Sequence, residues 1–197
     1  MSERDAKMVR RVTTGHNCAG KAVVISDSVV AGDTVALLPG ADFHQLWGAD
    51  VPPRFPDDGA RPAAPRYFPP LGGFRFMMFT VAPHEQAKAQ AQQASGNRDA
   101  MRREIREKLP GLAEHMERSH PGMHTTDTID FEYIISGEVW LELDDGVTVH
   151  LRAGDTVVQN GTRHAWRNFG SEPCRIVVFM LGVSRDPSGL EIAQRAG

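Results

Sequence analysis

The chain has 197 residues, a formal net charge of −3 and 41% hydrophobic residues. This size predicts one domain, or one domain with a substantial arm. The acidic balance lacks the basic footprint of a protein that binds nucleic acid. No apolar run is long enough for a membrane-spanning helix, and the first residues lack the apolar core of a signal peptide. With only two cysteines, a cytoplasmic protein with free thiols is expected.

Residues 1–72 are predicted to form an arm that packs on the main domain. The segment 51–70 is dense in proline, which cannot join the hydrogen bonding of a central strand. This segment is interpreted either as an ordered wrap or as a mobile cover. Ahead of it, a hairpin is predicted across the turn-forming residues 17–20. The strands expected in the arm are 10–14, 21–26, 34–37 and 44–47.

A helical insert is predicted at about 84–118. Asn97 can cap a helix, because its side chain can accept a hydrogen bond from a backbone N–H of the first turn. Met101, Ile105 and Leu109 recur every four residues and so form one apolar face. The insert directly precedes a group of polar residues that could form a functional site, so we expect it near the opening of the main domain.

Alternating apolar residues predict the strands of the main domain, which is assigned residues 73–182 with a tail at 183–197. The runs 139–143 and 147–151 place every second side chain on one face, as in half-buried strands. Asp145 and Gly146 supply the turn between them. Further strands are expected at 73–81, around Val157 and at 175–181. The predicted fold class is all-β.

Two groups of polar residues resemble the two motifs of the cupin superfamily of small β-barrels. The family's second motif is Pro-x-Gly-x-x-His-x-x-x-Asn. Gly161, His164 and Asn168 fall on this pattern, with Gln159 where the family usually has proline. The resemblance covers about 120–182 and implies a single-domain cupin barrel, a double-stranded β-helix or jelly roll.

The first motif of that family is His-x-His, three or four residues, Glu, six residues and Gly. Counting back seven residues from Gly137 places Asp130 at the position of the family's Glu. Thr126 then stands at the second His, and His124 at the first. The Thr-Asp-Thr-Ile-Asp run is similar to a bacterial and fungal subgroup of cupins.

The resemblance implies that His124, Asp130 and His164 face one another inside the barrel. Two imidazoles and a carboxylate suit a divalent Fe, Mn, Zn or Ni ion and leave positions open for substrate. No organic cofactor is implied. The alternative is a barrel without metal, in which the histidines hydrogen-bond to substrate or to Asp130. Thr126 is a poor ligand for these ions, and its hydroxyl is assigned to a bound water or a substrate oxygen.

Glu132 lies two residues beyond Asp130, so strand alternation places both carboxylates on the inward face. Two carboxylates close together in a medium of low dielectric constant raise one pKa. Glu132 is therefore a candidate general acid or base, beside His124 and His164. Otherwise it pairs with an arginine such as Arg75 on a neighbouring strand. The residues expected to bind substrate are Thr126, Gln159, Trp166 and Arg75.

The leading functional prediction is a small-molecule enzyme whose divalent metal polarises an oxygenated or carbonyl substrate. The fold family implies a lyase or decarboxylase, an isomerase or a dioxygenase. The alternative is a metal-free, non-catalytic protein that binds a small molecule. A DNA-binding regulator is disfavoured, because the chain is acidic and has no evident helix-turn-helix pattern. Since the strand-rich arm has edges to protect, a homodimer is predicted.

Overall fold

The computed structural model describes residues 8–93 and 97–186, and its regular structure is mostly β. The strands are β1 (Met8–His16), β2 (Ala22–Ala31), β3 (Phe43–Ala49), β4 (Phe74–Val81), β5 (Thr128–Ser136), β6 (Glu138–Glu142), β7 (Thr148–Arg152), β8 (Thr156–Asn160), β9 (Ala165–Arg167) and β10 (Cys174–Gly182). The helices are α1 (His84–Gln93), α2 (Arg98–Lys108) and α3 (Leu112–His115), with a 3-10 turn, η2, at Asp144–Gly146. The predicted all-β fold class is confirmed.

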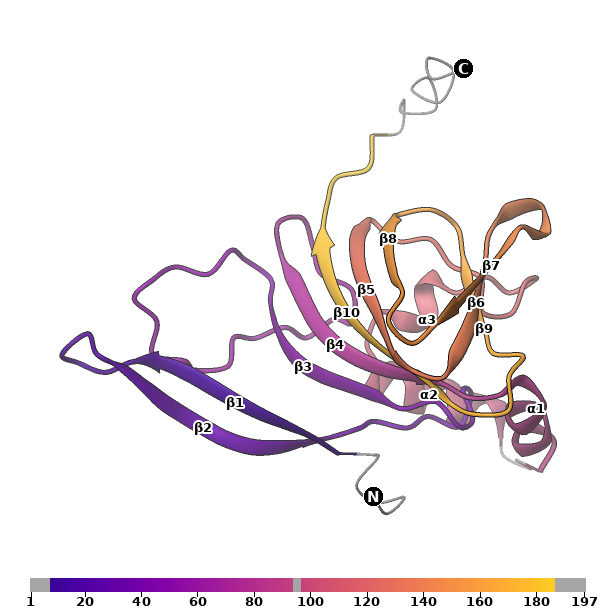
Figure 1. Cartoon of the computed structure of the whole chain (residues 1–197), viewed down its shortest axis with the longest axis horizontal. Coiled ribbons are helices and arrows are strands. Elements are labelled where there is room, and N and C mark those ends of the chain that lie inside the picture. Colours follow the sequence, from indigo (N-terminus) through magenta and orange to yellow (C-terminus); the bar gives the residue numbers. More distant parts are fainter. Residues whose placement is uncertain (1–7, 94–96, 187–197) are drawn as a thin grey trace.

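Two antiparallel sheets form the barrel (Figure 1). The larger sheet has the strand order β3-β4-β10-β5-β8, and the smaller has the order β7-β6-β9. The hairpin of β6 and β7 turns at Asp145 and Gly146, which have φ angles of 56° and 73°. Such left-handed values are what a tight hairpin turn requires, and they explain why the Asp-Gly pair marked this turn in the sequence.

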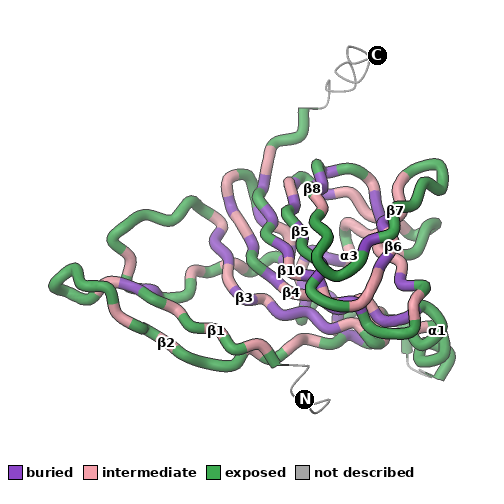
Figure 2. Tube along the Cα trace, viewed as in Figure 1, coloured by how far each residue is buried: buried purple, intermediate pink, exposed green. Residues whose placement is uncertain are grey.

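Two clusters of buried apolar side chains fill the barrel. One cluster lies where the helical insert covers the inner face of the larger sheet, and it includes Met77, Leu109 and Val178. The other lies between the two sheets and includes Ile134, Val139 and Ile176. In Figure 2 the buried residues accordingly follow the barrel strands, whereas the hairpin of β1 and β2 is largely exposed.

The arm contains the predicted hairpin, with strands β1 and β2 that are longer than the sequence pattern indicated. The predicted strand at 44–47 is also present, as β3, and it pairs with β4 as an edge strand of the barrel's larger sheet. The strand predicted at 34–37 is wrong. The backbone turns there instead, with Leu38 N–H donating to Val35 and Ala41 N–H donating to Leu38, and Asp33 alone forms a β-bridge to Phe43.

The predicted helical insert is present as α1, α2 and α3, and it packs against the inner face of the larger sheet. Asn97 caps α2 by accepting a hydrogen bond of 2.8 Å from the backbone N–H of Asp99. Ile105 and Leu109 are buried against the larger sheet, which confirms the predicted apolar face. Among the described residues, no helix is both long and apolar enough to span a membrane.

Candidate functional site

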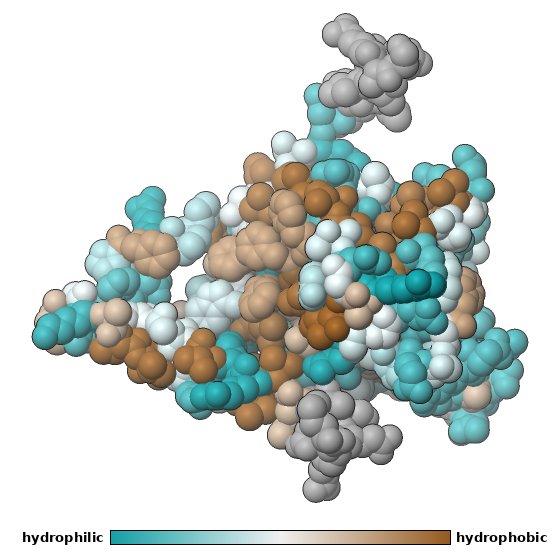
Figure 3. Space-filling view, viewed as in Figure 1, coloured by the Kyte–Doolittle hydropathy of each residue, from teal (hydrophilic) through white to brown (hydrophobic). Residues whose placement is uncertain are grey.

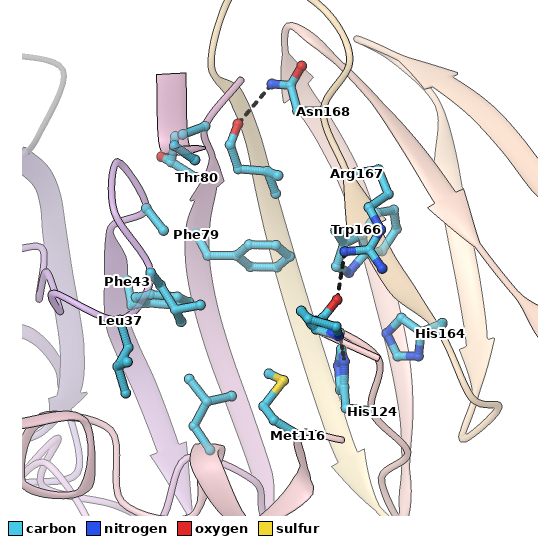
Figure 4. Close-up of a pocket in the computed structure, with 18 of the residues that line it drawn as sticks. Leu37, Phe43, Phe79, Thr80, Met116, His124, His164, Trp166, Arg167 and Asn168 are labelled. Atoms are coloured by element: carbon cyan, nitrogen blue, oxygen red, sulfur yellow. Dashed lines mark hydrogen bonds between the residues drawn. The ribbon is translucent and has the colours of Figure 1, made fainter. Parts of the chain in front are cut away.

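A cavity of about 420 Å³ opens between the inner face of the larger sheet, β9 and the helical insert (Figure 4). Its walls are mainly apolar and come from segments far apart in the sequence. Figure 4 shows Phe79 reaching across the cavity toward Trp166, with His124 and His164 side by side beyond Met116. The apolar side chains of the wall include Leu38, Phe43, Tyr67, Phe79, Met116 and Trp166.

Two carboxyl groups of β5 supply the acidic part of the lining. Asp130 and Glu132 are each only 5% exposed, as the alternation of β5 predicted. Oδ1 of Asp130 and Oε2 of Glu132 are buried with no hydrogen-bond partner among the described residues. Arg75 therefore does not pair with Glu132. A buried charge without a partner is costly, so at least one carboxyl group is protonated or awaits a ligand.

The two carboxyl groups differ in acidity because their surroundings differ. Burial raises the pKa of Asp130 to about 6, with the Thr128 hydroxyl acting in the opposite direction. Burial raises the pKa of Glu132 well above its ordinary value, and the nearby Asp130 raises it further. At neutral pH, Asp130 is therefore mainly ionised, and Glu132 holds its proton more tightly than an ordinary glutamate does, so the pair is suited to sharing one proton.

Tyr67 is a third polar residue near the carboxyl pair, and the sequence analysis did not single it out. Burial raises the pKa of Tyr67, and Asp130 and Glu132 raise it further, so the phenol lies within their electrostatic reach. The ring packs edge-on against Phe43 with centroids 6.0 Å apart, and its backbone N–H donates to Pro110 at 2.7 Å. An aromatic residue at the end of a proline-rich segment was the available signal, but no spacing rule links it to β5.

His124 and His164 form a matched pair. Their backbones exchange two hydrogen bonds of 3.0 Å, which bring the ring centroids to 4.2 Å. Each ring places Nδ1 3.0 Å from the carbonyl oxygen two residues earlier, that of Gly122 or Thr162. A carbonyl can only accept, so Nδ1 carries the proton in both rings and Nε2 keeps a lone pair.

Both histidines are neutral at physiological pH. Burial, and to a smaller extent the neighbouring His124, lower the pKa of His164 to about 4. Burial also lowers the pKa of His124, against the Gly122 carbonyl, which raises it. The pair is therefore uncharged and offers two hydrogen-bond acceptors to a ligand in the cavity.

The residues do not fit the predicted three-ligand metal site. A neutral imidazole whose Nδ1–H is hydrogen-bonded can bind a metal through Nε2. His124 and His164 could therefore each supply one of the three ligands. Yet in the described part of the chain, no group of three His, Cys, Asp or Glu side chains lies close enough to hold a metal ion. Asp130 is held on β5, whereas His124 and His164 are bridged to each other on segments outside β5. The three side chains therefore do not come together around one point.

Three of the residues expected to bind substrate are not part of the cavity lining. Thr126 is buried against Thr128, with their hydroxyl oxygens 2.8 Å apart. Gln159 is buried, and its Nε2 donates to the carbonyl oxygen of Thr162 at 3.4 Å. Arg75 is on the inner face, but its guanidinium donates to Asp50 at 2.6 Å and to three backbone carbonyl oxygens. Each side chain is occupied by its own neighbours.

Trp166 and Asn168 do line the cavity. The Trp166 ring meets the His164 ring edge-on at 6.0 Å, so it forms the wall beside the histidine pair. The Asn168 amide donates to the carbonyl oxygens of Val81 and Glu172 and accepts from the N–H of Gly170. Asn168 thus ties the end of β4 to the loop before β10, which shapes the cavity.

Residues 113–180 match the family model of the cupin domain, Cupin_2. This part of the chain is a cupin domain. The matched region runs from α3 to β10, so it includes the histidine pair and both carboxyl groups of β5. The resemblance seen in the second motif is thereby confirmed at the level of the domain.

Two curated relatives match a short part of this chain. Phomopsin biosynthesis cluster protein C' of Diaporthe leptostromiformis is 48% identical over 46 residues, which are 23% of this chain and 24% of that protein. Oryzines biosynthesis cluster protein J of Aspergillus oryzae is 45% identical over 53 residues, which are 25% of this chain and 30% of that protein. The matched part thus spans less than a third of either relative.

Among solved structures, the cupin domain of Cnp3 from Schizosaccharomyces pombe resembles this chain with a TM-score of 0.44. The two are 10% identical, and the superposition covers 94% of this chain and 93% of the other. At this level of similarity no function is carried over.

Proposed function

We propose that this cupin domain is an enzyme that moves protons on a small, mainly apolar carbonyl compound. The observation that carries the proposal is the pair of buried carboxyl groups, Asp130 and Glu132, each with an oxygen that has no partner in the described protein. Both groups line one apolar cavity. A ligand that hydrogen-bonds to them would remove the cost of burying them unpaired.

The acid and the base follow from the two pKa values. Asp130, with its pKa raised to about 6, accepts a proton from the carbon next to the carbonyl group. Glu132, whose pKa is raised further above its ordinary value by the charge of Asp130, donates its proton to the carbonyl oxygen. The products are an enol, a protonated Asp130 and an ionised Glu132. Return of the proton at another carbon gives an isomer, and loss of a neighbouring leaving group gives the product of a lyase.

The rest of the cavity supports the choice of substrate. The neutral rings of His124 and His164 offer two acceptors for hydroxyl or N–H groups of a ligand. The apolar wall favours a hydrocarbon or aromatic body. Both relatives reported above are named for the biosynthesis clusters of small molecules, phomopsin and oryzines. We therefore expect the substrate to be an intermediate in the biosynthesis of such a compound.

Hydrogen exchange tests the proton transfer without knowledge of the natural substrate. We expect the protein to accelerate exchange of the α-hydrogens of an apolar bicyclic ketone, such as 1-tetralone, in D₂O, as followed by NMR. Glu132→Gln keeps shape and neutrality but has no proton to transfer, so exchange should fall by about a hundredfold while ketone affinity stays within a fewfold. Exchange undiminished in Glu132→Gln would remove Glu132 from the mechanism.

Elemental analysis tests whether the chemistry is independent of metal. The proposal routes no step through an ion, so the activity should survive dialysis against a chelator. The proposal would be contradicted if elemental analysis found one divalent ion per chain in the wild type, and if His164→Ala lost both that ion and the activity.

The competing function is a non-catalytic protein that binds a small molecule. The mainly apolar wall and the two neutral histidines would serve binding equally well. The same experiment separates the two functions. A ketone that binds with measurable affinity in the cavity, but exchanges only at the rate of the buffer, would favour the binding protein.

A further inference from the structure

The hydroxyl group of Tyr67 is a hydrogen-bond donor that the protein itself does not satisfy. Tyr67 is only 6% exposed, and it lines the same cavity as Asp130 and Glu132. No residue in the described part of the chain forms a hydrogen bond with this hydroxyl group. Burying a hydroxyl group without a partner is costly, so a ligand with an accepting oxygen would be stabilised there.

The ring of Tyr67 is held in one orientation. It packs edge-on against Phe43 and Phe68, with ring centroids 6.0 Å and 4.9 Å away. The backbone N–H donates to the carbonyl oxygen of Pro110 at 2.7 Å, which ties the main chain to the helical insert. A donor on a ring that is already fixed loses little freedom when a ligand binds, so its direction is set in advance.

The other buried polar side chains of the lining have few donors to spare. Thr80 donates to a neighbouring carboxylate, and Asn168 donates to two backbone carbonyl oxygens. His164 donates from Nδ1 to a backbone carbonyl oxygen, so it presents only an acceptor at Nε2. Among the buried polar side chains in the described lining, Tyr67 and the protonated form of Glu132 therefore remain as the O–H donors at neutral pH.

We propose that Tyr67 is a further catalytic residue, whose hydroxyl group donates a hydrogen bond to the substrate's carbonyl oxygen beside Glu132. This proposal rests on the function proposed above. A carbonyl oxygen has two lone pairs, so it can accept from both O–H groups at once. As Asp130 removes the proton from the neighbouring carbon, negative charge develops on this oxygen and strengthens both hydrogen bonds. Glu132 transfers its proton to the oxygen, whereas Tyr67 keeps its own.

The surroundings of the phenol favour this division of roles. Burial raises the pKa of Tyr67, and Asp130 and Glu132 raise it further. Tyr67 therefore stays protonated throughout the neutral range and can act only as a donor that stabilises charge. A neutral donor beside a protonated carboxyl group is an arrangement suited to stabilising an enol or enolate oxygen.

The arm and the cupin part of the chain each contribute to this site. Asp130 and Glu132 belong to β5, inside residues 113–180 that match the cupin family model. Tyr67 lies outside that match, at the end of the arm nearest the cavity. The cupin part therefore supplies the acid and the base, and the arm supplies the second donor to the oxygen.

Tyr67→Phe tests the hydroxyl group alone, because it removes one oxygen atom and keeps the ring. In the exchange assay with 1-tetralone, the rate should fall by about a hundredfold, while ketone affinity falls by no more than about tenfold. Tyr133→Phe is the matched control and should exchange at the wild-type rate. Tyr133 is the chain's other tyrosine; it is 46% exposed and lies on the outer face of β5, where hydrophobic residues gather (Figure 3).

Two further ligands test the contact without turnover. 1-Naphthol carries its hydroxyl group where the enol of 1-tetralone carries one, and naphthalene has the same ring system without oxygen. The ratio of the two affinities, measured by fluorescence titration, should shift by about tenfold against 1-naphthol in Tyr67→Phe and stay unchanged in Tyr133→Phe. Naphthalene affinity itself should stay within about twofold. Circular dichroism establishes that both variants are folded.

The two assays separate this inference from the proposed function. A wild type that binds 1-tetralone but does not accelerate its exchange contradicts the proposed function and, with it, the catalytic role of Tyr67; the affinity ratio then still decides whether the hydroxyl group contacts the ligand. If the wild type exchanges and Tyr67→Phe exchanges equally fast, Tyr67 is not catalytic. An equal loss of affinity for both ligands, or a wild type that does not bind 1-naphthol, overturns the contact.

Discussion

The carboxyl groups of Asp130 and Glu132 make the stability of the barrel depend on pH. Both pKa values are raised in the folded chain, so the folded state binds more protons than the unfolded state. Their contribution to stability is fully present below the unfolded pKa values, near 4, and is lost as pH rises through the folded values. His124 and His164 act in the opposite sense, because their lowered pKa values favour the folded state at high pH.

The double variant Asp130→Asn/Glu132→Gln isolates the carboxyl contribution, since both proteins keep the histidines. Near pH 4 the variant and the wild type should be about equally stable, because protonated carboxyl groups resemble amides. At pH 8 the variant should be more stable by roughly 2–3 kcal/mol, the order expected from the shift of Asp130 to about 6. Urea unfolding at several pH values measures the difference. A gap that does not grow with pH would mean that both carboxyl groups are ionised without penalty.

Sequence reasoning predicted side-chain direction at this scale but not side-chain partners. Alternation along β5 was enough to place Asp130 and Glu132 inside the barrel. It also placed Arg75 inside, yet the guanidinium is bound to Asp50 and to backbone carbonyl oxygens that no pattern could reveal. Tyr67 was missed for the same reason. Its position depends on an irregular backbone and on contacts between segments far apart in the chain.

At the scale of elements, the helical insert closes the cavity and holds the barrel's end together. Leu109 is fully buried in the same apolar cluster as Tyr67 and Met77. The carbonyl oxygen of the next residue, Pro110, accepts the N–H of Tyr67, so the insert also positions the proline-rich segment. The segment also contacts the hairpin, because the N–H of His16 donates to the carbonyl oxygen of Asp57.

Leu109→Ala should destabilise the protein by about 3 kcal/mol, because it leaves a cavity in the cluster that the surroundings fill only in part. Arg102→Ala on α2 is the control, since Arg102 is exposed and its loss should cost no more than about 0.5 kcal/mol. Chemical denaturation gives both values. Equal effects in the two variants would mean that α2 is not anchored by its apolar face.

Elements with a regular period were predictable, and irregular ones were not. The period of two in β5 and β6, and the spacing of four in α2, each predicted one buried face correctly. In β7 the same period predicted a half-buried strand, but only Leu151 is buried there, and Val149 is exposed. The strand expected at 34–37 failed because Val35 and Leu37 alternate over too short a run to outweigh the turn that follows at Pro39 and Gly40.

At the scale of the whole molecule, the arm connects the hairpin with the cavity. The hairpin is bound to the proline-rich segment at His16, whose N–H donates to the carbonyl oxygen of Asp57 at 2.7 Å. That same segment contains Tyr67, which lies within electrostatic reach of the carboxyl pair. The arm therefore supplies part of the cavity wall and ties it to the hairpin.

If the homodimer predicted for the strand-rich arm forms as the chain folds, the melting temperature should rise with protein concentration. A tenfold increase in concentration stabilises a dimer by about 1.4 kcal/mol, half for each chain. For a chain of 197 residues this corresponds to about 2 °C for each tenfold step. Differential scanning calorimetry should find this slope in the wild type, and a melting temperature that ignores concentration would separate folding from assembly.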